Sequence, residues 1–144
     1  MYNTDVELAQ NLRLALGRLS RRLRRLYVDA ESGPAFLELA VLHRLDRQGP
    51  AHPGAISDDE GVTSAAVAAS LSSLESRGLI VRDRDASDGR RIVVTLTGAG
   101  RKTLKGRDDA CVAALGRALD GLTQRERDVL LAAVPLLETL ASTL

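Results

Sequence analysis

The sequence predicts a mainly α-helical fold that contains one small β-hairpin. Apolar residues recur at helical spacing on both sides of one exception, the stretch from Gly78 to Gly100. There, two short runs rich in β-branched residues, Leu79–Val81 and Ile92–Leu96, flank a polar loop, which is typical of a β-hairpin with a charged tip. The residues of this loop are Asp83, Arg84, Asp85, Asp88, Gly89, Arg90 and Arg91.

Turn and capping residues divide the rest of the chain into helices. Gly33-Pro34 and Gly49-Pro50 break the chain, Thr63 suits a helix N-cap, and Gly78 suits the residue that follows a helix. The expected helices cover about residues 5–27, 35–47, 52–61, 63–77, a stretch that begins after Thr97, and 123–140. In the second helix, the side chains expected to face the core are those of Phe36, Leu39, Val41, Leu42 and Leu45.

The last two expected helices contain residues that disfavour helix. Gly100, Gly106 and Gly116 lower the helix propensity of the fifth. Pro135 lies inside the sixth and should kink it or end its first half, because proline has no N–H and clashes with the preceding turn.

Composition limits the class of protein. The 144 residues are 44% hydrophobic, which is enough for a core, and only 2% aromatic, which argues against binding by stacked bases. One cysteine excludes an intramolecular disulfide, and no apolar run approaches the ~18 residues of a membrane span. The N-terminus lacks the basic and apolar regions of a secretory signal. We therefore expect a cytoplasmic protein without membrane contact.

Charge is concentrated around the hairpin. The whole chain carries a net charge of only +1, yet the stretch from Glu75 to Arg107 holds nine cationic and four anionic side chains. A local excess of positive charge in a nearly neutral protein is typical of a nucleic-acid contact. A helix followed by a basic hairpin is also the arrangement of a winged helix-turn-helix.

These patterns predict two regions. Residues 34–97 form a winged helix-turn-helix unit that binds DNA, and residues 1–30 and 98–144 form a helical dimerisation region. The outer helices carry apolar stripes that the small unit cannot cover, and such stripes often pack across a two-fold axis. The helix expected over about residues 5–27 also carries several arginines on its other faces. These arginines could form a solvated face, contact phosphates or pair with a partner. The expected interface residues are Leu12, Leu16, Leu19, Val134, Leu137 and Leu140.

The helix over about 63–77 is the expected recognition helix. Val67, Leu71 and Leu74 share one face, and the opposite face carries only small side chains. In a major groove, alanine can contact a thymine methyl, but no residue there can make a bidentate contact to a base. Direct readout by this helix should therefore be weak, and a plain surface helix is the alternative.

The hairpin over about 82–92 is the expected wing. Arg84, Arg90 and Arg91 flank a turn at Asp88-Gly89, and an arginine there can enter a minor groove. The Asp88 carboxylate is placed to hold the Arg90 guanidinium by a charge-assisted bond. The alternative is a solvated charged loop. The full set of expected DNA contacts is Thr63, Ser64, Ala65, Ala68, Ala69, Ser72, Ser73, Arg77, Arg84, Asp88, Arg90 and Arg91.

Four parts of the sequence resemble the MarR family of bacterial transcription regulators. They are GVT at residues 61–63, LESRGLI at 74–80, DGRRIVVTLT at 88–97, and Gly100. The resemblance implies a homodimer that binds a pseudo-palindromic operator, usually as a repressor, with the terminal helices as the dimer interface. It also implies relief by a small aromatic ligand or by cysteine oxidation, and Asp88 and Arg90 as the wing pair. Ala68 and Ala69 stand where the family often has arginine or threonine, which shifts the expected binding towards the wing.

Other classes of function find less support. His43 and His52 have no fixed carboxylate partner in the sequence, the acidic run at residues 58–60 lacks calcium-loop spacing, and no glycine-rich phosphate motif occurs. We expect no enzyme activity, metal or cofactor. Cys111 lies in an apolar helical stretch, so packing is a better interpretation than a redox switch. A winged helix that binds proteins instead of DNA stays open.

Overall fold

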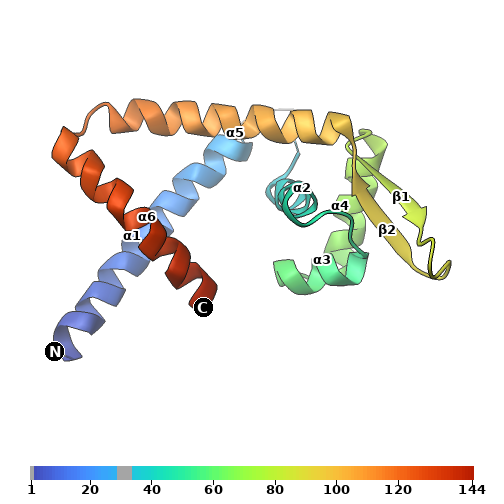
Figure 1. Ribbon diagram of the computed structural model, residues 1–144, viewed down its shortest axis with the longest axis horizontal. Coiled ribbons are helices and arrows are strands. Elements are labelled where there is room, and N and C mark those ends of the chain that lie inside the picture. Colours follow the sequence, from blue (N-terminus) through green and yellow to red (C-terminus); the bar gives the residue numbers. More distant parts are fainter. Residues whose placement is uncertain (1, 29–33) are drawn as a thin grey trace. The chain divides into compact units, whose positions relative to one another are not determined.

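The computed structural model describes residues 2–28 and 34–144, and Figure 1 shows its helices and one hairpin. The described residues form α1 (Tyr2–Val28), α2 (Phe36–Gln48), α3 (Pro53–Glu60), α4 (Ser64–Ser76), β1 (Ile80–Arg84), β2 (Ile92–Leu96), α5 (Gly98–Leu119) and α6 (Gln124–Thr143). The predicted mainly α-helical fold with a small hairpin is confirmed. The expected break at Gly33 lies outside the described residues.

The chain divides into two compact units. Residues 1–109 include α1 to β2 and the first part of α5, and residues 110–144 include the end of α5 and α6. In the first unit, Figure 1 shows the hairpin extending beside α4, beyond the helices α2 and α3. The first unit therefore contains both elements that the sequence singled out for nucleic-acid contact.

The hydrophobic core lies in the first unit and joins α2, α3, α4, the hairpin and the start of α5. The buried apolar residues are Leu39, Val41, Leu42, Leu45, Ala51, Ile56, Val67, Leu71, Leu74, Leu79, Ile80, Val94, Leu96 and Leu104. The prediction for α2 is right except at Phe36, whose side chain is 44% exposed. Phe36 is the first residue of α2, and the Arg24 guanidinium lies over its ring, 4.4 Å from the ring centre.

The ends of α4 follow the capping signals in the sequence. The Thr63 hydroxyl accepts a hydrogen bond from the Ala66 N–H at 3.1 Å. At the other end, Gly78 has φ +70°, and the N–H of Leu79 donates to the Leu74 carbonyl while the N–H of Gly78 donates to that of Glu75. Because glycine adopts this conformation without steric cost, the chain turns directly from α4 into the hairpin.

The first strand is longer than its β-branched run. The register pairs Ile80 with Leu96 and Arg84 with Ile92, so β1 extends past Val81 to Arg84. The expectation that Asp83 and Arg84 belong to the loop is therefore wrong. Backbone pairing with β2 holds this segment as a strand, although its side chains are exposed and polar.

One residue outside the hairpin, Ala51, pairs with β2 on the edge that β1 does not occupy. Ala51 and Val94 exchange two backbone hydrogen bonds, of 3.1 and 2.8 Å. This bridge places the residue after Ala51, which is His52, directly beside the hairpin. The sequence carries no hairpin or strand signal at Ala51, because one residue of a bridge has no periodicity.

The start of α5 is fixed against the end of α4. The Thr97 hydroxyl accepts from the Gly100 N–H at 3.0 Å and donates to the Gly78 carbonyl at 2.7 Å, and the Thr97 N–H donates to the Leu79 carbonyl. Gly100 is buried, and a Cβ atom there would overlap the Leu79 carbonyl oxygen. The sequence marked Gly100 as a weak helix residue, and the structure gives the steric reason for glycine.

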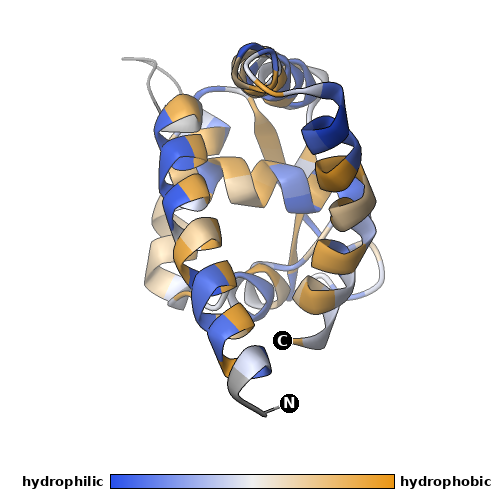
Figure 2. Cartoon of the chain, turned by 90° about the vertical axis from the view of Figure 1, so that its left-hand side faces the viewer, coloured by the Kyte–Doolittle hydropathy of each residue, from blue (hydrophilic) through white to orange (hydrophobic). Residues whose placement is uncertain are grey.

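In the second unit, α6 continues through Pro135, so the possibility that this proline ends the first half of the helix is wrong. Proline removes one backbone hydrogen bond, and the turns on either side keep the rest. None of the residues of α6 is buried within the single chain. Figure 2 shows hydrophobic residues recurring along both α6 and α1.

The hydrogen bonds at the N-terminus of α6 should make the stability of the fold depend on pH. Thr123 donates its backbone N–H and its hydroxyl to the Glu126 carboxylate, each at 2.8 Å, and these bonds lower the pKa of Glu126. Because the folded pKa lies below the unfolded one, this stabilisation is present above the pH at which glutamate ordinarily titrates and is lost as pH falls through the folded pKa.

We therefore expect Glu126→Gln to lower the urea midpoint of unfolding at pH 7 and to leave it nearly unchanged at pH 3. Urea titrations followed by circular dichroism at both pH values measure this. Glu138→Gln, near the other end of α6, is the matched control. An equal effect of Glu126→Gln at both pH values would contradict the assignment.

Candidate nucleic-acid interface

The outward face of α4 is made of small exposed side chains. Val67, Leu71 and Leu74 point into the core, as the spacing predicts. On the opposite side, Ser64, Ala65, Ala68, Ala69 and Ser72 are exposed and Ser73 is half-buried. Thr63 is exposed, but its hydroxyl is engaged as the helix cap. This face can approach another surface closely, and it offers only short hydroxyl groups as hydrogen-bond partners.

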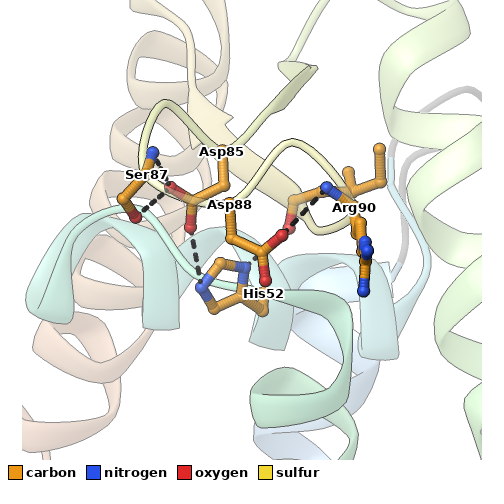
Figure 3. Close-up of polar contacts among 6 residues, drawn as sticks. His52, Asp85, Ser87, Asp88 and Arg90 are labelled. Carbon is orange, nitrogen blue, oxygen red and sulfur yellow. Dashed lines mark hydrogen bonds and ion pairs between the residues drawn. The ribbon is translucent and has the colours of Figure 1, made fainter.

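The loop between the strands is ordered by its own backbone. The Asp85 N–H donates to the Arg91 carbonyl at 2.9 Å, and the Arg91 N–H donates to the Asp88 carbonyl at 3.0 Å, which closes a β-turn over residues 88–91. In Figure 3, the Asp88 carboxylate accepts from the backbone N–H of Arg90, at 3.1 Å.

The expected bond between the Asp88 carboxylate and the Arg90 guanidinium is therefore not formed. A short aspartate side chain reaches the backbone two residues ahead more readily than it reaches the end of an arginine. Within residues 2–28 and 34–144, the guanidinium groups of Arg90 and Arg91 have no hydrogen bond or ion pair. Both are exposed, so the turn presents two long cationic side chains with their donors available.

Arg84 has a different place from the other two arginines. It is the last residue of β1, and its Nη1 donates to the Gly89 carbonyl at 3.2 Å. The guanidinium therefore spans the base of the turn and helps to hold it. Of the three arginines expected around the tip, Arg84 binds the loop itself, while the guanidinium groups of Arg90 and Arg91 are unpaired among the described residues.

His52 connects the loop to the N-terminus of α3. Its Nδ1 lies 2.9 Å from the Ile92 carbonyl oxygen, and its Nε2 lies 3.3 Å from an Asp85 carboxylate oxygen (Figure 3). The other Asp85 oxygen accepts from the Ser87 N–H at 2.9 Å and from its hydroxyl at 2.7 Å. These bonds to Ser87, with a smaller contribution from His52, lower the pKa of Asp85.

The side chain of His52 binds the hairpin and does not cap the helix that it precedes. His52 occupies the N-cap position of α3, but its side chain makes no capping bond. The expectation that it has no fixed carboxylate partner is wrong. Asp85 and Ile92 are distant in the sequence, so no local pattern could have revealed the contacts.

A second contact joins α4 to β1. Arg82 donates Nη2 and Nε to the two Glu75 carboxylate oxygens, at 2.9 and 3.2 Å, and its backbone N–H also donates to Glu75. This bidentate pair lowers the pKa of Glu75 and raises that of Arg82. No local pattern in the sequence indicates this pairing, because Glu75 and Arg82 lie on different elements. It fixes the root of the hairpin against the helix beside it.

The sequence pointed to three further residues, Arg77, His43 and Cys111. Arg77 is the C-cap residue of α4, and its Nη1 lies 3.7 Å from the Glu38 carboxylate of α2. His43 has a carboxylate partner, Asp108, at 3.3 Å, contrary to expectation. In the part of the chain that the structure describes, no three His, Cys, Asp or Glu side chains are close enough to hold a metal ion. Cys111 is buried, in keeping with a packing role.

A membrane-spanning role finds no helix to support it. Among the described residues, no helix is both long and apolar enough to cross a bilayer.

Comparisons of the sequence with protein families and with known proteins both find transcription regulators. The sequence model of the MarR family matches residues 37–92, from α2 to the start of β2. An HTH-type transcriptional regulator of Mycobacterium tuberculosis is 31% identical over 95% of this chain and 94% of its own length. One of Mycobacterium leprae is 30% identical over 90% of both chains.

Solved structures show the same fold over nearly the whole chain. A Pseudomonas aeruginosa protein described as a candidate transcriptional regulator has 38% identity and a TM-score of 0.85, over 97% of this chain and 96% of its own. A MarR family protein from Bacillus stearothermophilus has a TM-score of 0.79 at 19% identity, over 99% of this chain and 98% of its own. The second likeness concerns the fold alone.

Proposed function

Because this chain belongs to the MarR family of transcription regulators, we propose that it represses transcription by binding a pseudo-palindromic duplex as a homodimer. The observation that carries the proposal is the pair Arg90 and Arg91. Their guanidinium groups are exposed on a turn that backbone hydrogen bonds hold in place. Because the fold does not use these two side chains for its own stability, they are available to bind phosphates or to enter a minor groove. Because the members of this family are regulators and not enzymes, the chain is assigned as a regulator without enzyme activity.

The winged unit, residues 34–97, supplies the DNA contacts in this proposal. The exposed face of α4 lies in the major groove, and its small side chains let the backbone approach the bases closely. The wing enters the adjacent minor groove. Because α4 has no long donor on this face, the free energy of binding comes mainly from Arg90, Arg91 and phosphate contacts. Specificity then depends more on the shape of the duplex than on base-edge contacts.

The homodimer forms through residues 1–30 and 98–144 in this proposal. In a single chain, the side chains of Leu16, Leu19, Val134 and Leu140 are between 41% and 48% exposed. A second copy would remove this apolar surface from water, which favours association. The two-fold axis would place two copies of α4 in successive major grooves, about 34 Å apart. This spacing accounts for a pseudo-palindromic operator.

A small aromatic ligand could relieve repression by changing that spacing. It would have to bind the form that does not fit DNA more tightly than the form that does. Release of a bound duplex by a series of phenolic carboxylates, followed by fluorescence polarisation, tests this part separately. A series without effect would remove the ligand from the proposal and leave DNA binding intact.

The test of DNA binding is a polarisation titration with a duplex from the promoter of the protein's own gene. We expect saturable binding whose affinity falls steeply between about 50 and 200 mM salt, because phosphate contacts release counterions. Sedimentation of the free protein should give the mass of two chains. Absence of binding to any duplex at low salt would contradict the proposal and favour a winged helix that binds proteins.

A further inference from the structure

His52 is in contact with the wing from outside the hairpin. Its ring contacts the Ile92 carbonyl and the Asp85 carboxylate, and Figure 3 shows the contact with Asp85. Its side chain is 27% exposed and that of Asp85 is 18% exposed, so both are partly shielded from water. Asp85 begins the loop and Ile92 begins β2, so the ring contacts both ends of the segment that carries Arg90 and Arg91.

The chemistry of the two contacts depends on the protonation of the ring. A carbonyl oxygen and a carboxylate oxygen can only accept hydrogen bonds, so each needs an N–H from the imidazole. A neutral imidazole has one N–H, which leaves the lone pair of its other nitrogen facing an oxygen. The imidazolium has two and satisfies both contacts. The Ser87 bonds keep the pKa of Asp85 low, so its carboxylate stays ionised over the range in which histidine ordinarily titrates.

The other charged groups around the ring are engaged or distant. The Asp88 carboxylate binds the Arg90 N–H, and the Arg84 guanidinium binds the Gly89 carbonyl. On α3, Asp58, Asp59 and Glu60 are at the far end of the helix, and Asp59 pairs with Arg44 of α2. Arg90 and Arg91 lie on the turn, and neither is paired with Asp85 among the described residues. Asp85 is therefore the charged group within ion-pair distance of the ring.

We propose that His52 is a positioning residue for the wing, and that its protonated form fixes the loop in the geometry that presents Arg90 and Arg91 to DNA. At low pH the imidazolium joins both ends of the loop. As pH rises and the ring loses its charge, one contact becomes unfavourable and the loop loosens. DNA affinity should then decrease with rising pH. This inference rests on the proposed function for its effect on DNA, but its effect on the loop does not.

The first test observes the wing without DNA. Amide hydrogen exchange of Asp85 and Arg91, whose N–H groups close the loop, is measured by NMR from pH 5.5 to 8.0 and corrected for the intrinsic exchange rate. We expect protection to fall by about two- to fivefold across this range, the effect of one partly exposed ion pair. His52→Gln should show the same low protection at every pH. An unchanged pH dependence in this variant would overturn the proposal.

The chain offers a matched control, because it contains two histidines. His43 lies on α2 beside Asp108, away from the hairpin, so His43→Gln should keep the wild-type pH dependence. Asp85→Asn, which removes the charge and keeps the size of the side chain, should lose it as His52→Gln does. If His43→Gln abolished the effect and Asp85→Asn did not, the titrating group would be elsewhere and the proposal would be wrong.

The second test measures duplex affinity of the same variants over the same pH range at constant ionic strength. We expect the wild type to bind about two- to fivefold more tightly at pH 5.5 than at pH 7.5, and the His52→Gln protein to bind with nearly constant affinity. A chain that binds no duplex at any pH but shows the exchange effect would contradict the proposed function alone. Equal pH dependence of affinity in wild type and His52→Gln would contradict the role of His52 in positioning the wing.

Discussion

Gly100→Ala is expected to lower the free energy of unfolding by about 3 kcal/mol, the upper part of the range for overpacking a well-packed site. A methyl group at Gly100 would overlap the backbone carbonyl of Leu79 and approach within 2.6 Å of a Leu96 methyl carbon. A flexible side chain could move away, but the Leu79 carbonyl is held by the Thr97 N–H. The first turn of α5 would have to shift away from the hairpin, with loss of contacts in the core.

Gly106→Ala is the matched control, because it makes the same chemical change in the same helix. Nothing lies within 4 Å of a Cβ atom at Gly106, so alanine should leave stability unchanged or raise it by up to ~1 kcal/mol through its better helix propensity. Urea unfolding followed by circular dichroism measures both variants. If the two had the same midpoint, the close packing of α5 on the hairpin would not exist in solution.

Arg90→Ala is expected to weaken duplex binding by about tenfold, or ~1.4 kcal/mol. Its guanidinium is a long donor that the fold leaves available, and the loop that carries it is ordered before binding, so little conformational entropy is lost on contact. The slope of log affinity against log salt should decrease by about 1 for each phosphate contact that is lost. Polarisation titrations at several salt concentrations provide both quantities.

Two variants separate this effect from a general loss of charge. Ser72→Ala removes a short hydroxyl from α4 and should change affinity by less than about twofold, since no direct base readout is expected there. Arg47→Ala removes one exposed cation from α2 and should also have little effect. Equal and small losses for Arg90→Ala and Ser72→Ala would place the main contacts elsewhere.

Local patterns were enough to predict the helices and the hairpin. Thr63 caps α4 and Gly78 ends it, as expected, because capping depends on residues within one turn. Two predictions failed because neighbouring elements, and not the local sequence, decide the structure there. The charged end of β1 is a strand because β2 lies beside it, and Phe36 is exposed because it stands at the first position of α2.

The details of the wing could be predicted only in part. The arginines of the tip were visible in the sequence, but the division of roles between Arg84 and Arg90 was not, since it depends on which donor reaches Gly89. His52 could not be connected to Asp85 because their contact depends on the Ala51 bridge to β2. The pairing of Glu75 with Arg82 required the turn at Gly78, which brings the helix and strand together. Tertiary contacts of this kind leave no local periodicity.

The small side chains of α4 also make this protein a useful starting point for protein engineering. Ala68 and Ala69 are exposed and make no core contacts, so a longer residue there adds to the surface without repacking the interior. If α4 occupies the major groove as proposed, an asparagine or arginine at either position could contact a chosen base, with a gain of roughly 1–3 kcal/mol in discrimination. New operator preferences could then be introduced on this scaffold one position at a time, with the wing left unchanged.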